Sequence, residues 1–160
     1  MLAWAQIATV VCTLAAVWQD VQHRRVPNAL VLLVVALAVV LLASGQPVWP
    51  GLTWFSAMLA AVVGLIVFGW FYARGLMGAG DVKFFAASGL LVGPFGLCLV
   101  WLVASLLGGL HAVAIHLRGR AGRPARARGV PYAAYMAAGI LLVLSLRSGI
   151  EAMRGLPPYS

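Results

Sequence analysis

Acidic residues are almost absent from this 160-residue chain, which contains only three: Asp20, Asp81 and Glu151. Only 9% of the residues are charged and 64% are hydrophobic, and so few charges cannot solvate the surface of a globular domain. This composition excludes a soluble enzyme and a disordered tail. We therefore predict an integral membrane protein, and we expect a single transmembrane domain over residues 1–160 because no Ser- or Pro-rich linker divides the chain.

The chain also has little that would serve metal binding or nucleophilic catalysis. Its two cysteines, Cys12 and Cys98, lie in apolar stretches and form no CxxC pair, so we interpret them as packing residues. No Ser-His-Asp set is evident, and three acids are too few for a metal cage. His23 lies three residues from Asp20, but we interpret it as a loop residue. We predict neither a metal nor a cofactor.

Basic residues are in excess, with 11 Lys and Arg and a net charge of +8. In so apolar a chain, this excess indicates positive charge on the cytoplasmic side of a membrane, and we predict no nucleic-acid partner. The segment Arg118–Arg128 carries five Arg and no acid. We interpret it as a loop that fixes topology and binds anionic lipid headgroups.

Long apolar runs predict membrane helices. Four runs are uninterrupted: Leu2–Trp18, Val26–Ala43, Leu52–Tyr72 and Val130–Leu146. The region Asp81–Leu117 is broken by Gly-Pro-Phe-Gly at residues 93–96, and it forms either one overlong helix or two short ones. With two, nine of the 11 basic residues fall in loops on one side. We therefore predict an all-α bundle of six transmembrane helices with both termini on the non-cytoplasmic side.

The predicted fourth helix, Asp81–Val92, is unusually short. Its 12 residues span about 18 Å, whereas the hydrocarbon core is about 30 Å thick. Either the bilayer is locally thinned, or the Asp81 end lies in a water-accessible hollow lined by protein.

Two acids occupy comparable positions in this topology. Asp20 follows the first predicted helix and Asp81 opens the fourth, so both lie at cytoplasmic helix ends. Acids near membrane depth are costly and are candidates for function. Two adjacent carboxylates share a proton, so that one acts as a base on water and the other as an acid on a peptide carbonyl. The alternatives are a solvated interfacial residue for Asp20 and a helix N-cap for Asp81.

Asp81 ends the sequence Gly-Ala-Gly-Asp at residues 78–81. Because Gly78 and Gly80 lack side chains, they allow a substrate backbone to approach the aspartate and allow the loop to adopt positive φ. The alternative is that they only form a helix-breaking turn.

Four other residues receive structural interpretations. Pro27 and Asn28 indicate the start of the second helix, with Asn28 as its cap. Lys83 faces away from Asp81 in a regular helix, and we expect it to snorkel to the interface. We expect His111 to hydrogen-bond within the bundle.

Two of these segments carry a resemblance. Asp20 begins Asp-Val-Gln-His-Arg-Arg-Val-Pro-Asn, and Gly-Ala-Gly-Asp is followed by Val82 and Lys83. The pair resembles the aspartic prepilin peptidases, membrane proteases of the GxGD class, and specifically the short form associated with Flp (tight-adherence) pili. Gly-Val-Pro-Tyr at residues 129–132 resembles the family's entry to its last helix, although Ala133 stands where Gly is usual. The cysteine-containing insert of longer members is missing, so the resemblance implies no N-methyltransferase activity.

The resemblance implies an intramembrane aspartic endopeptidase of the bacterial inner membrane, with Asp20 and Asp81 as its catalytic residues. Its implied substrates are prepilin or pilin-like precursors, whose short basic leaders are removed at the cytoplasmic membrane face. The alternative is a non-enzymatic subunit or small proton-coupled transporter that uses the same two acids as relay groups. Broken helices with repeat symmetry, expected of a transporter, are not apparent. The sequence gives no oligomeric state.

Overall fold

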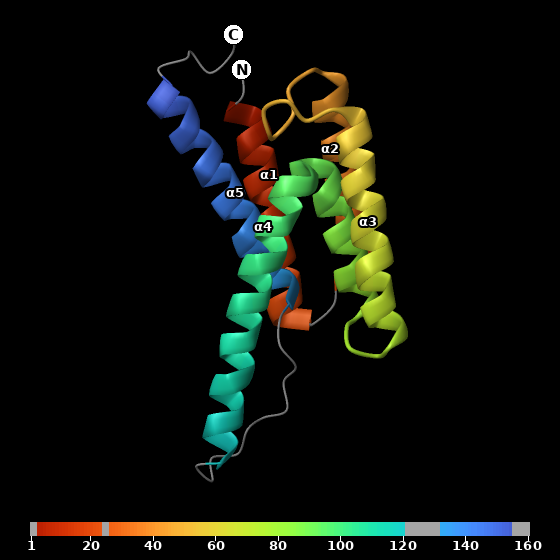
Figure 1. Cartoon of the computed structure of the whole chain (residues 1–160), viewed down its shortest axis with the longest axis vertical. Helices are drawn as coiled ribbons and strands as arrows, with labels where there is room; N and C mark the ends of the chain where they lie inside the picture. The colour runs from red at the N-terminus through yellow and green to blue at the C-terminus, as the bar shows by residue number, and fades with distance from the viewer. Residues whose placement is uncertain (1–2, 24–25, 121–131, 155–160) are drawn as a thin grey trace.

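The computed structural model describes residues 3–23, 26–120 and 132–154. In these ranges the chain forms five α-helices: α1 (Ala3–His23), α2 (Asn28–Ala43), α3 (Trp54–Ala73), α4 (Ala79–Arg120) and α5 (Tyr132–Arg154). The prediction of an all-α membrane protein is consistent with this architecture. Figure 1 shows the C-terminal end of α1, the turn between α3 and α4 and the N-terminal end of α5 toward the same, lower end of the bundle.

The prediction of six transmembrane helices is wrong. Among the described residues, three helical segments are long and apolar enough to cross a membrane: Trp54–Ala73, Ala79–Leu117 and Tyr132–Ile150. α2 is apolar but has only 16 residues, and polar residues such as Gln6 and Gln19 make α1 less hydrophobic. The predicted side of the two termini depended on six crossings and no longer follows; residues 1–2 and 155–160 lie outside the described ranges.

The fourth and fifth predicted helices are two arms of α4. This element has 42 residues, and its backbone is non-helical at Gly93, with φ 71° and ψ −176°. A residue with a Cβ rarely adopts this φ, and Pro94 supplies no N–H to the helix. A Cβ at Gly93 would also lie 2.5 Å from Cδ1 of Leu52. The chain reverses direction at this kink without an intervening loop (Figure 1).

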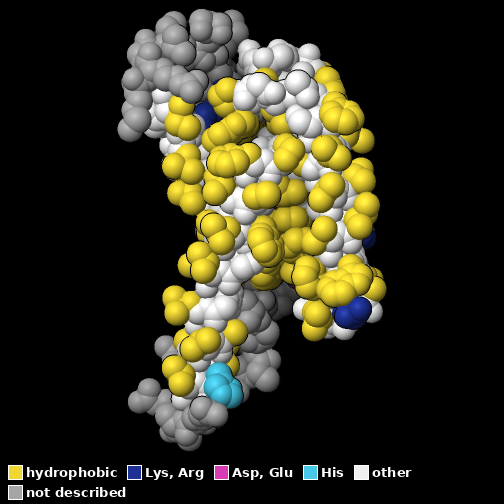
Figure 2. All heavy atoms as spheres, in the orientation of Figure 1, with side chains coloured by type: hydrophobic (Ala, Val, Ile, Leu, Met, Phe, Trp, Pro, Cys, Tyr) yellow, Lys and Arg dark blue, Asp and Glu magenta, His cyan; other side chains and the backbone are white. Residues whose placement is uncertain are grey.

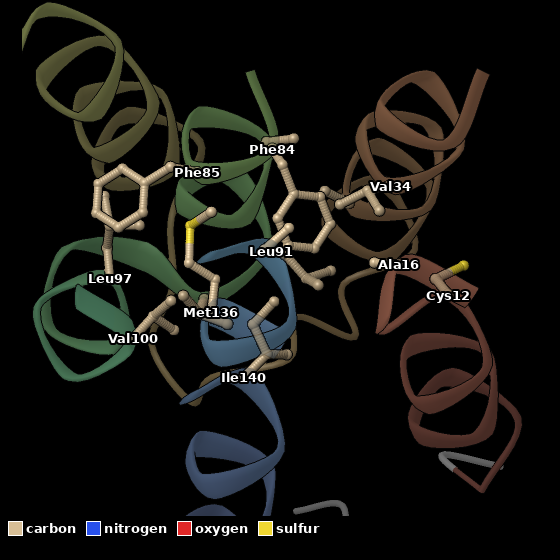
Figure 3. Close-up of a cluster of buried hydrophobic side chains, with 14 of the residues drawn as sticks. Cys12, Ala16, Val34, Phe84, Phe85, Leu91, Leu97, Val100, Met136 and Ile140 are labelled. Atoms are coloured by element: carbon tan, nitrogen blue, oxygen red, sulfur yellow. The ribbon is translucent and has the colours of Figure 1, made fainter. Parts of the chain in front are cut away.

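The core is built from side chains of all five helices. Figure 3 shows part of it, where side chains of α1, α2, α4 and α5 converge in the middle of the bundle. Helices approach most closely at glycines. A Cβ at Gly89 would lie 2.9 Å from the carbonyl carbon of Ala60, and one at Gly139 would lie 2.7 Å from Cα of Val100. Small residues permit such close crossings between membrane helices, so α3 and α5 each pack tightly against α4.

The outer surface is largely apolar. Hydrophobic side chains cover most of the described face in Figure 2, and α3 exposes large ones such as Phe55 and Ile66. A lipid environment suits this surface, because so many exposed apolar side chains would be costly in water.

A buried arginine closes the end of the bundle that carries the Gly93 kink. Arg147 of α5 is 6% exposed, and its guanidinium donates hydrogen bonds to the carbonyl oxygens of Pro47 and Val48 at 3.0 and 2.5 Å. The ring of Trp49 packs against Phe95, with centroids 5.7 Å apart. These contacts fix the connection between α2 and α3.

Candidate active site

Asp20 is a buried acid. It lies near the C-terminal end of α1 with 5% of its surface exposed, and its Oδ2 accepts a hydrogen bond from the backbone N–H of Ala134 at 3.0 Å. Ala134 is the third residue of α5, where backbone N–H groups have no acceptor within their own helix. The alternative of a solvated interfacial residue is therefore wrong for Asp20, whose carboxylate is held by the first turn of another helix.

Asp81 lies within electrostatic range of this carboxylate. It is the third residue of α4, after Ala79 and Gly80, so it is not the N-cap that the alternative interpretation required. Its N–H donates to the carbonyl of Gly78 at 3.1 Å, and its carboxylate interacts with the Gly78 backbone in return. It also experiences the charge of Asp20. The fold thus brings together two acids from distant parts of the chain.

Gly78 and Gly80, which precede Asp81, are required for the room that a missing side chain leaves and not for an unusual backbone conformation. The prediction of positive φ at Gly78 and Gly80 is wrong, because the left-handed glycine in this turn is Gly75, at φ 70°. A Cβ at Gly78 would lie 3.3 Å from Oδ2 of Asp81, and a Cβ at Gly80 would lie 3.3 Å from the carbonyl oxygen of Val26. Both distances are tighter than most real contacts. The glycines therefore leave room for the carboxylate and for the chain entering α2.

Lys83 and Asn28 join the two motifs. Lys83 is exposed, and its Nζ donates to Oδ1 of Asn28 at 3.1 Å. Asn28 is the first residue of α2, whose N-cap is Pro27 and shows no side-chain cap, so the predicted cap is wrong. The prediction that Pro27 starts this helix is confirmed, since its carbonyl accepts from the N–H of Leu30 at 3.0 Å.

Sequence reasoning missed the first turn of α5. The ring of Tyr132 packs near Phe68, with centroids 6.4 Å apart, and its hydroxyl lies 3.4 Å from Oγ of Ser105. Tyr132 also experiences the charge of Asp81. A signal was present, because the Gly-Val-Pro-Tyr motif ends at Tyr132, but it predicted only a helix entry; residues 129–131 lie outside the described ranges.

The remaining candidates are accounted for separately. The predicted hydrogen bond of His111 is confirmed, since its Nδ1 pairs with the hydroxyl of Tyr135. His23 is exposed at the end of α1. In the described part of the chain, no three His, Cys, Asp or Glu side chains are grouped as metal ligands would be. The side chains of Arg118–Arg128 lie outside what the structure describes.

An apolar groove of about 180 Å³ lies between α3 and α4. Its lining consists of Val63, Gly64, Val67, Phe68, Phe85, Leu97, Cys98 and Trp101. Phe68 and Phe85 stack with their ring centroids 3.7 Å apart. Phe85 follows Asp81 by four residues on α4, so this lining residue lies about 6 Å along the helix axis from the backbone of Asp81.

The fold and the site define a class: helical membrane proteins that hold a pair of carboxylates at one end of the bundle. The model of the type IV leader peptidase family matches residues 7–113, more than half of the chain and a span that includes both acids. The chain therefore belongs to the type IV leader peptidase family.

The chain is also similar to a curated protein, the prepilin leader peptidase/N-methyltransferase of Bacillus subtilis (strain 168), with 28% identity over 125 residues. The alignment covers 77% of this chain but 48% of the relative, so the chain spans about half the length of the curated relative it matches. No solved structure matches.

Proposed function

We propose that this protein is an aspartic endopeptidase that removes short basic leader peptides from prepilin or pilin-like precursors. The observation that carries the proposal is that Asp20 and Asp81 lie within electrostatic range of each other. Placing two acids so close costs folding free energy, and such pairs are concentrated at functional sites. Membership of the type IV leader peptidase family and the similarity to a prepilin leader peptidase support the same activity.

The chemistry follows from a proton shared between the two carboxylates. The ionised acid takes a proton from a water molecule, whose oxygen attacks the carbonyl carbon of the scissile peptide bond. The protonated acid donates its proton to the carbonyl oxygen, giving a neutral tetrahedral intermediate. This intermediate collapses as the C–N bond breaks: the leaving nitrogen takes up the proton that the base accepted from water, and one hydroxyl of the intermediate gives its proton to the other carboxylate, which restores the shared proton. No covalent bond to the enzyme forms.

The site is proposed to lie at the cytoplasmic face of the bacterial inner membrane. Arg74 ends α3 and Lys83 lies in the first turns of α4, so both basic residues flank the turn that leads to Asp81. Loops on the cytoplasmic side of membrane proteins are rich in Lys and Arg. A soluble basic leader would then reach the two acids from the cytoplasm.

The apolar segment that follows the leader is proposed to lie in the groove between α3 and α4. A helix whose first peptide bond lies at Asp81 would place its next turns beside Phe85 and Trp101. The groove's native Cys98 is exposed whereas Cys12 is buried, which provides a chemical probe. A cysteine in the first two turns of the precursor's apolar segment should form a disulfide with Cys98 in the Asp81→Asn variant.

A matched variant sharpens this cross-linking test. The double variant Cys98→Ala/Leu106→Cys moves the thiol out of the groove but keeps it on the same arm of α4. Leu106 is 64% exposed and does not line the groove, so the new thiol is also accessible. The cross-link should be lost. Equal cross-linking from both positions would show that the groove does not select the segment.

The activity itself is tested by co-expressing the protein with a pilin-like precursor and measuring leader removal by gel shift and mass spectrometry. Wild type and Glu151→Gln, which alters the remaining acid of the chain, should both cleave, whereas Asp81→Asn should not. The mass of the product identifies the bond cut. Failure of wild type to cleave any basic-leader precursor, at matched membrane levels, would contradict the proposal.

A further inference from the structure

The first turn of α5 makes an unusual contact with the site. Ala134 and Asp20 are 114 residues apart in sequence, yet the backbone N–H of Ala134 donates to Oδ2 of Asp20 at 3.0 Å. This N–H belongs to the group of donors at a helix start that have no acceptor in their own helix. Asp20 is 5% exposed, so water contributes little to holding its carboxylate.

We propose that the first turn of α5 positions Asp20 and favours its ionised form, so that Asp20 is the base of the pair and Ala134 is a positioning residue. An N–H donor stabilises a carboxylate more than a carboxylic acid, and the positive end of the α5 dipole acts in the same direction. Asp81 then carries the shared proton. This inference rests on the proposed function.

The packing of α5 keeps this donor in place. Ala133, Met136 and Ala137, which follow Tyr132 within two turns, are fully buried. One turn further, Gly139 crosses α4 so closely that a Cβ would lie 2.7 Å from Cα of Val100. α5 therefore cannot slide along α4 without breaking these contacts, and the N–H of Ala134 is presented to Asp20 from a rigid support.

The helices that carry the site contribute several other charged and titratable groups among the described residues. α4 contributes Asp81, a second acid whose negative charge would repel that of Asp20. It also contributes Lys83, which donates a hydrogen bond to Asn28 of α2. α5 contributes Tyr132, and α1 itself contributes the exposed His23. The backbone N–H of Ala134 is a donor that directly offsets the repulsion between the two acids.

Ala134→Pro removes this one N–H at a position where the helix does not use it. Ala134→Gly and Ala134→Ser keep the N–H and serve as controls. With a leader-containing precursor peptide as substrate, the Pro variant should lose about 10- to 100-fold in kcat, the range expected for a hydrogen bond to a charged group, with KM unchanged. The acidic limb of its pH–rate profile should move to higher pH, whereas both controls should match wild type.

A Pro variant with the kcat and pH profile of wild type would overturn the inference while leaving the proposed function intact. If the Pro variant does not accumulate in the membrane, a backbone ester at residue 134, made with lactic acid in place of Ala134, removes the same N–H without a ring. The ester variant should show the same loss of kcat and the same shift, and wild-type behaviour would overturn the inference. Absence of cleavage by wild type would overturn the proposed function and this inference with it.

Discussion

A buried charged residue lies near each end of α5: Arg147, which belongs to α5 itself, and Asp20 of α1. The surroundings of the two charges differ. Arg147 donates to the carbonyl oxygens of Pro47 and Val48, groups whose partial charge is opposite to its own. Asp20 accepts from the N–H of Ala134 in a comparable way, but it lies within electrostatic range of Asp81, and the two acids would repel each other if both were ionised. Both side chains are less than one-tenth exposed.

This comparison separates a structural charge from a candidate catalytic one. At the Arg147 end, the charge and its backbone partners attract each other, and their contact stabilises the connection between α2 and α3. At the Asp20 end, the backbone contact only offsets a repulsion that folding itself creates. Removing the charge should therefore cost stability at the first end and activity at the second.

The largest effect is expected from Asp81→Asn. Cleavage should fall by roughly 10³-fold or more, because the variant loses one member of a proton-sharing pair. Thermal stability in detergent should not fall, since a repulsion is removed. A fall in Tm matching that of Arg147→Met would show that Asp81 is a structural residue, and the comparison between the two ends would fail.

Arg147→Met should give the opposite result. The variant keeps much of the apolar stem but leaves one buried and one part-buried carbonyl oxygen without this donor, which should cost about 2–4 kcal/mol of unfolding free energy. Cleavage per folded molecule should stay within about threefold of wild type. Fluorescence-detected unfolding and an activity assay on the same preparation measure both quantities.

Gly93→Ala tests the kink that separates the two arms of α4. A Cβ at φ 71° is strained and would meet Leu52, so unfolding free energy should drop by about 1–3 kcal/mol. Gly109→Ala is the matched control, because nothing lies within 4 Å of its Cβ position, and it should be neutral or slightly stabilising. Equal effects from the two substitutions would contradict the proposed strain.

Lys83→Met should have the smallest effect. Its hydrogen bond to Asn28 is exposed, so its loss should lower kcat/KM by about two- to five-fold. Asn28→Ala should cost a similar amount, and the double variant should cost no more than either single one. Additive losses in this double-mutant cycle would show that the two side chains act independently.

Apolar runs predicted where helices lie better than how many cross a membrane. The second run, Val26–Ala43, is observed as Asn28–Ala43, and the third, Leu52–Tyr72, is observed as Trp54–Ala73. The Gly-Pro signal at residues 93–94 was interpreted as a turn between two helices, and in the structure the non-helical Gly93 separates the two arms of α4. The wrong count of transmembrane helices has other causes: α2 has only 16 residues, α1 is not among the segments apolar enough to span a membrane, and the two arms of α4 form one long apolar segment.

The sequence predicted those parts of the site that depend on particular side chains, and it could not predict the part that depends on the backbone. Asp20 and Asp81 were conspicuous because the chain has so few acids, and the structure places them together. The donor from Ala134 was invisible, because every residue except proline has a backbone N–H and only the tertiary fold aims this one at Asp20. The buried role of Arg147 was missed for the same reason, since its partners are backbone carbonyls.

The central claim, that Asp20 and Asp81 work as one unit, is tested most directly by the rates of Asp20→Asn, Asp81→Asn and the double variant on one precursor peptide, at equal amounts of folded protein. Each single variant should lose roughly 10³-fold or more, and the double variant should lose no more than the worse single one, because the pair shares one proton. A single variant within about tenfold of wild type, or losses that multiply in the double variant, would contradict the two-aspartate account.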